Sequence, residues 1–215
     1  MRVIAALVSV TGLLGLLQAA DVAAASPTPA AYCTPIDRTI FPASDYRLRN
    51  TTQELRYIAA DNYKVHTAPA LERLRKGELR YVLQDLNFVL RNWPNDLVAL
   101  EALVRYDLAG GERWGFMPTE CYFLEARRLY PEDPNVPALE GVFFARKGDS
   151  RRAMKSYQDA LVLNPSMPEV HYNLGLLYFE KKDFANSLKH ARLAYEGGYQ
   201  LPGLRKKLER AGYWQ

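Results

Sequence analysis

The sequence has few of the side chains that usually carry catalysis or bind metals. It contains three histidines, His66, His171 and His190, and no two of them lie four residues apart. There is no HExxH motif and no closely spaced cysteine pair that could hold zinc. A glycine-rich phosphate loop and a GxSxG turn are also absent. We therefore expect no catalytic site, no cofactor and no metal.

Excess charge of one sign is also missing. The formal net charge is +4 at pH 7, from 28 Lys and Arg against 24 Asp and Glu. This mild balance does not call for a nucleic-acid partner, and we expect none. After the N-terminal region no apolar run approaches the roughly 20 residues needed to span a bilayer. With 48% hydrophobic and 24% charged residues, the chain has the composition of a folded globular protein.

The first 25 residues have the pattern of a secretory signal peptide. Arg2 precedes the apolar run VIAALVSVTGLLGLLQAA, and Ala23 and Ala25 fit a small-residue cleavage site. An uncleaved anchor helix is the alternative, because the run approaches the length that spans a bilayer. We predict removal of residues 1–25, which takes away Arg2 and Asp21 and leaves the net charge at +4. The protein would then be exported, periplasmic or secreted, with no membrane span.

Both cysteines, Cys33 and Cys121, lie beyond that cleavage site. An even number of cysteines in an exported chain favours a disulfide. Such a bond would fasten an N-terminal arm, residues 26–54, to the rest of the protein. Apolar residues of the arm, such as Ile36 and Tyr46, also suggest that it lies along the body. The alternative is two separate thiols, one of them buried on a helix.

The last third of the chain contains a repeat of 34 residues. This interval separates Gly141 from Gly175, and the same interval relates Phe144 to Tyr178, Asp149 to Asp183, Ala153 to Ser187 and Ala160 to Ala194. Each copy has the pattern of two helices joined by a short turn. A glycine on the first helix and a small residue on the second allow the two backbones to approach closely. The pattern predicts regular helix pairs at 134–167 and 168–201.

In this register the residues resemble the tetratricopeptide repeat (TPR). The matches are Leu174, Gly175, Tyr178, Ser187 and Ala194 in the last copy, and Gly141, Phe144, Ala153, Tyr157, Ala160 and Pro165 in the copy before it. Pro137 and His171 depart from the family's preference for tryptophan. Glu140 replaces a leucine, and we expect it to loosen the packing there. The resemblance implies an all-α fold, a short right-handed α-solenoid of helix pairs.

Degenerate pairs precede the regular copies, at about 55–93 and 94–133, so that residues 55–215 form one helical repeat domain. In the second of these pairs the segment 110–118 lengthens the usual turn, and insertions in repeat proteins map to loops on one face. At the end of the chain, apolar residues recur at helical spacing among basic residues: Leu201, Leu204, Leu208, Ala211 and Trp214. The amphipathic segment 202–215 is predicted to cap the last repeat.

More loosely, the chain resembles exported bacterial repeat proteins of unassigned role. The residues that carry this resemblance are Asp45-Tyr46-Arg47, Asp85-Leu86, Asn92-Trp93-Pro94-Asn95, Glu120-Cys121, Leu201-Pro202-Gly203-Leu204 and Ala211-Gly212-Tyr213-Trp214. The resemblance supports export and a single domain, and it implies no activity.

Stacked helix pairs display a curved inner face formed by the first helix of each pair. By the family register the inner-face positions are Asn135, Ala138, Val142 and Arg146 in one copy, and Glu169, Tyr172, Asn173, Leu176 and Phe179 in the next. This mixture of apolar and hydrogen-bonding residues suits an extended peptide or a partner helix.

We therefore expect a non-catalytic protein-binding or scaffold module of the bacterial envelope, with a protein or peptide partner. One alternative is an accessory subunit of a secretion, pilus or polysaccharide assembly. Another is a hydrolase with a site built from the 110–118 insertion, where Glu112, Trp114 and Phe116 could line a small-molecule pocket.

Overall fold

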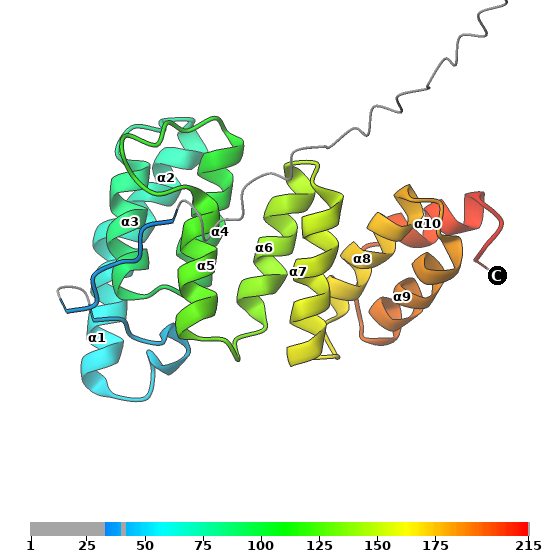
Figure 1. Cartoon of the computed structure of the whole chain (residues 1–215), viewed down its shortest axis with the longest axis horizontal. Coiled ribbons are helices and arrows are strands. Elements are labelled where there is room, and N and C mark those ends of the chain that lie inside the picture. Colours follow the sequence, from blue (N-terminus) through cyan, green and yellow to red (C-terminus); the bar gives the residue numbers. More distant parts are fainter. Residues whose placement is uncertain (1–32, 40–41, 215) are drawn as a thin grey trace, which may run out of the picture.

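The computed structural model describes residues 33–39 and 42–214, and within these ranges the chain forms helices and connecting segments without any strand (Figure 1). The helices succeed one another along the long axis of the molecule as an α-solenoid, which confirms the predicted all-α fold. The predicted signal peptide, residues 1–25, lies outside the described residues.

The N-terminal half begins with a long, interrupted helix. It comprises α1 (Gln53–Asn62), the π-helical turn η3 (Tyr63–Thr67) and α2 (Ala68–Lys76). The wide turn follows from Pro69, which has no N–H to donate to the carbonyl group four residues earlier. Instead, the Ala68 N–H donates to the carbonyl of Tyr63. The helices α3 (Val82–Asn92), α4 (Leu97–Leu108) and α5 (Thr119–Leu129) follow.

The C-terminal half consists of α6 (Asn135–Arg146), α7 (Ser150–Leu163), α8 (Pro168–Glu180), α9 (Phe184–Glu196) and the short α10 (Gly203–Arg210). Equivalent aspartates begin the second helix of each pair. The Asp149 side chain accepts a hydrogen bond from the Arg152 N–H, and Asp183 accepts one from the Asn186 N–H. Each bond satisfies a backbone donor that has no partner inside its helix.

The two repeat glycines lie where paired helices touch. The Ser187 hydroxyl donates to the Gly175 carbonyl at 2.8 Å, so α8 and α9 approach as closely as the sequence predicts. A Cβ atom on Gly141 would be 2.5 Å from the ring of Tyr157 on α7, and one on Gly175 would be 2.5 Å from the side chain of Leu204 on α10. Thus the same space is filled by a side chain of the pair in one copy and by the capping helix in the other.

Glu140 does not loosen the packing, contrary to the expectation from its substitution for leucine. Its side chain on α6 is buried and accepts hydrogen bonds from Arg127 on α5 at 2.7 Å and from the Ser156 hydroxyl on α7 at 3.0 Å. Arg127 also pairs with Asp159 at 2.7 Å. A buried carboxylate that is charge-paired and hydrogen-bonded can be accommodated without water. This network ties three helices together.

The N-terminal arm is fastened to the helices by a disulfide and by polar contacts. Cys33 and Cys121 are bonded, which confirms the predicted pairing. The Ser44 N–H donates to the last carbonyl of α3, that of Asn92. Further along, the Tyr46 N–H donates to the buried amide oxygen of Asn95 at 2.8 Å. The arm therefore lies against α5 and the C-terminal end of α3, as the apolar residues in its sequence suggest.

Candidate partner-binding surfaces

The expected inner-face positions on α6 remain partly accessible. Ala138 and Val142 are half-buried against the main core, and Arg146 is exposed at the end of the helix. Asn135 is half-buried at the start of α6, where its amide donates to Asp133 at 3.0 Å. Two apolar side chains, Ala138 and Val142, thus lie between the polar groups of Asn135 and Arg146 along α6.

The expected positions on α8 divide into two groups. Glu169 is exposed and Asn173 is half-buried, so both can be reached from solvent. Tyr172 is 7% exposed, and it packs in a small second core with Leu204 and Leu208 of the capping helix. Leu176 and Phe179 pack against the same core. Tyr172 is therefore part of the core beneath the cap rather than an accessible inner-face residue.

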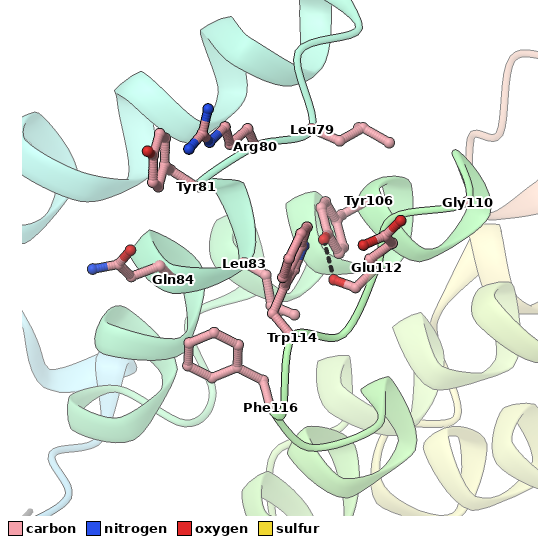
Figure 2. A pocket seen from close by; sticks show the side chains of 10 residues that line it. All are labelled: Leu79, Arg80, Tyr81, Leu83, Gln84, Tyr106, Gly110, Glu112, Trp114 and Phe116. Carbon is pink, nitrogen blue, oxygen red and sulfur yellow. Dashed lines mark hydrogen bonds between the residues drawn. The ribbon is translucent and has the colours of Figure 1, made fainter.

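A second surface is a pocket of about 650 Å³ beside the insertion between α4 and α5 (Figure 2). One wall is the turn from α2 to α3 and the start of α3. The other wall is the end of α4 and the insertion itself. The lining residues are mostly aromatic or apolar: Leu79, Arg80, Tyr81, Leu83, Gln84, Tyr106, Gly110, Glu112, Trp114 and Phe116.

Tyr106 holds the insertion against the end of α4. Its hydroxyl donates to the carbonyl of Glu112, as the dashed line in Figure 2 shows. The ring lies so close to Gly111 that a Cβ atom there would be 2.3 Å from it. The Phe116 N–H donates to the carbonyl of Arg113 at 2.7 Å, which closes the next turn. These contacts give the insertion a defined conformation, in which it forms one wall of the pocket.

Two aromatic residues of the pocket have left-handed backbones. The backbone φ angle is 66° at Tyr81 and 46° at Trp114, in a region that residues other than glycine rarely adopt. Both remain solvent-exposed, Tyr81 at 54% and Trp114 at 72%. Strained backbone of this kind persists only where surrounding structure imposes it, and it is common at binding sites. Its occurrence on both walls of one pocket marks the pocket as a candidate site.

The pocket contains the residues expected for the hydrolase alternative, but not a matching set of chemical groups. Glu112, Trp114 and Phe116 all line it. Among the described lining residues Glu112 is the sole carboxylate, and none is serine, cysteine or histidine. Hydrolysis by acid–base chemistry usually needs a second carboxylate or an activated nucleophile. The lining is better suited to binding.

The fold also brings together two histidines that are distant in the sequence. The Nδ1 atoms of His171 on α8 and His190 on α9 are 2.9 Å apart. The Nε2 of His171 lies 2.9 Å from the Pro165 carbonyl, which can only accept, so this nitrogen carries a proton. In that tautomer the Nδ1 of His171 has no proton, and it accepts a hydrogen bond from the Nδ1–H of His190. Burial is the main cause that lowers the pKa of His190 to about 4.

We expect acid to destabilise the fold through His190. The unfolded chain takes up a proton near pH 6.5, whereas the native state does so only near pH 4. The contribution of neutral, buried His190 to the free energy of unfolding should therefore be fully present above about pH 6.5. The free energy of unfolding should fall by about 1–3 kcal/mol as the pH drops to about 4. Urea unfolding at several pH values measures this slope. His190→Gln, which can still donate to His171, should flatten it, whereas parallel curves for the two proteins would contradict the assignment.

Neither a metal site nor a membrane span is found in the part of the chain that the structure describes. Within it, no three or more His, Cys, Asp or Glu side chains are grouped so that they could hold a metal ion. Over the same residues, no helix combines the length and apolar character needed to cross a membrane.

Comparison with known families identifies one match. The family model of the TPR repeat matches residues 144–182, which include the end of α6, all of α7 and α8, and the turn after α8. No curated protein matches the sequence. A TPR repeat is therefore present in the regular part of the solenoid, and repeats of this family are typically non-catalytic modules for protein–protein interaction.

Proposed function

We propose that the protein is a non-catalytic interaction module of the bacterial envelope that binds a peptide or a partner helix on the inner face of α6 and α8. The TPR match carries this proposal, because it covers α8 and the end of α6, two helices that would supply the binding positions. The N-terminal sequence pattern supports the location in the envelope. A role as accessory subunit of a larger envelope assembly is a special case of the same function.

The accessible part of this face sets the chemistry of the partner. Ala138 and Val142 offer apolar contact, while Arg146 and Glu169 offer charges of opposite sign at its edges. Asn173 adds an amide that can bond the backbone of an extended segment. Because Ala138 and Val142 are the accessible apolar residues among the expected positions on α6, we expect a single helix or strand-like peptide, not a broad protein surface.

Site-specific photo-crosslinking in intact envelopes tests the proposal. A benzoyl-phenylalanine at Val142 or Asn173 should give one discrete crosslinked product. The matched control is the same probe at Val162, which is 81% exposed on α7 and outside the inner face. Arg146→Glu should weaken the crosslink at Val142. Crosslinking from Val162 alone, or no product from either inner-face position, would refute the proposed surface.

A further inference from the structure

The pocket beside the α4–α5 insertion lies apart from the inner face. It is formed at the edge of the solenoid where the first and second helices of the N-terminal pairs are joined. In Figure 1 the α4–α5 loop lies next to the turn between α2 and α3. None of the inner-face positions on α6 and α8 lines it. A ligand of this pocket could therefore be bound together with a partner on the inner face.

We propose that this pocket binds an extended, proline-containing segment of a partner protein. Segments of this kind adopt a polyproline II helix, whose prolines dock between aromatic rings while its backbone carbonyls stay unpaired. The pocket supplies aromatic surface from both walls, with Tyr81 on one and Trp114 and Phe116 on the other (Figure 2). A ligand that is already extended before it binds loses less entropy on binding.

The polar groups at the rim fit the same kind of ligand. Gln84 on the first turn of α3 can donate its amide to a ligand carbonyl, as donors do in grooves that hold polyproline II segments. Glu112 and Arg80 place charges of opposite sign on opposite walls, and the Arg80 guanidinium lies over the Tyr81 ring at 4.8 Å. A proline-containing segment with a basic flank on the side of Glu112 would complement these charges.

The protein's own arm brings a proline-containing segment close to the insertion loop. Thr34, Pro35 and Ile36 line a smaller cavity of about 250 Å³, which Gly115, Phe116 and Met117 of the loop also line. This stretch of the arm has no regular secondary structure, and Ile36 is 7% exposed. Phe116 lines both this cavity and the larger pocket. Phe116 therefore connects the larger pocket with a cavity that a proline-containing segment of the arm helps to line.

Peptide selection against the whole chain tests this proposal. A displayed library of random 12-residue peptides is panned on the wild type, and the selected peptides are measured by fluorescence polarisation. We expect the selected sequences to carry two prolines in a PxxP pattern. Binding should weaken roughly tenfold or more in Tyr81→Ala/Trp114→Ala.

Matched variants show whether the aromatic rings of the pocket bind the peptide. Tyr57→Ala removes a ring that is 73% exposed on α1, and it should leave binding unchanged. Trp114→Phe in the wild type keeps an aromatic ring at the same backbone position, and this variant should retain most of the affinity for the peptide. Arg146→Glu, which changes the inner face, should leave the affinity of the pocket for the peptide unchanged. Loss of pocket binding can therefore be distinguished from loss of binding at the inner face.

Three outcomes would overturn the proposal. Selection that yields no binders, or binders without proline, excludes this ligand class. Trp114-dependent binding of maltohexaose or chitohexaose without peptide binding would assign the pocket to carbohydrate. Tighter peptide binding by Pro27→Ala/Pro29→Ala would show that the chain's own residues 26–32, SPTPAAY, compete for the pocket, and so assign it to the arm rather than to a partner.

Discussion

Replacing both Cys33 and Cys121 with alanine is expected to lower the free energy of unfolding by about 3–5 kcal/mol. The bond joins residues that are 88 positions apart, and a cross-link over so long a loop removes much of the conformational freedom of the unfolded chain. Denaturant unfolding of the oxidised wild type and of the double variant measures the difference. Because short repeat arrays can unfold in parts, fluorescence and circular dichroism should be followed together.

Contacts in the native arm provide the control for this experiment. The Ser44 N–H and the Tyr46 N–H donate to the body, and Arg38 pairs with Glu125 at 2.8 Å. We therefore expect the amides of Ser44 and Tyr46 to stay protected from hydrogen exchange in the variant. Reductant should shift the wild type to the stability of the variant and leave the variant unchanged. A wild type with a demonstrably reduced bond and unchanged stability would contradict the argument.

The regular part of the fold could be predicted because local and tertiary requirements coincide there. Gly175 and Ser187 must both be small at one crossing of α8 and α9, and such a constraint appears in the sequence as a fixed interval. Glu140 shows where this reasoning fails. The family register predicts a leucine at this position, so the glutamate there suggests poor packing. Its partner Arg127, however, comes from the preceding, irregular pair, where no 34-residue interval sets a register.

The candidate surfaces are harder to predict from the sequence than the fold, for two physical reasons. The repeat alone predicts the inner face, whereas the capping helix that buries Tyr172 follows the repeat. The pocket depends on the left-handed backbones of Tyr81 and Trp114, and neither residue type favours that conformation. Glu112, Trp114 and Phe116 were nevertheless identifiable, because the insertion that carries them interrupts the repeat.

Replacing Leu204 with alanine is expected to lower the free energy of unfolding by about 2–5 kcal/mol, the range for a fully buried leucine. Its side chain fills the space above Gly175 that the Tyr157 ring fills above Gly141. The residue equivalent to Tyr157 in the last copy is Ala191, which is too small to reach it. Leu201→Ala is the matched control, since Leu201 is 57% exposed and its loss should cost less than about 0.5 kcal/mol.

The same geometry predicts the sign of a coupling between Leu204 and Ala191. Ala191→Tyr in the wild type should place the tyrosine ring against Leu204 and lower the free energy of unfolding by about 1–3 kcal/mol. In Leu204→Ala the ring can occupy the vacated space, as Tyr157 does beside Gly141, so the same substitution should cost less or stabilise the protein. Denaturant unfolding of the four proteins gives the coupling energy, expected at about 1–3 kcal/mol. Additive effects would mean that the cap and the Tyr157 ring do not fill equivalent spaces.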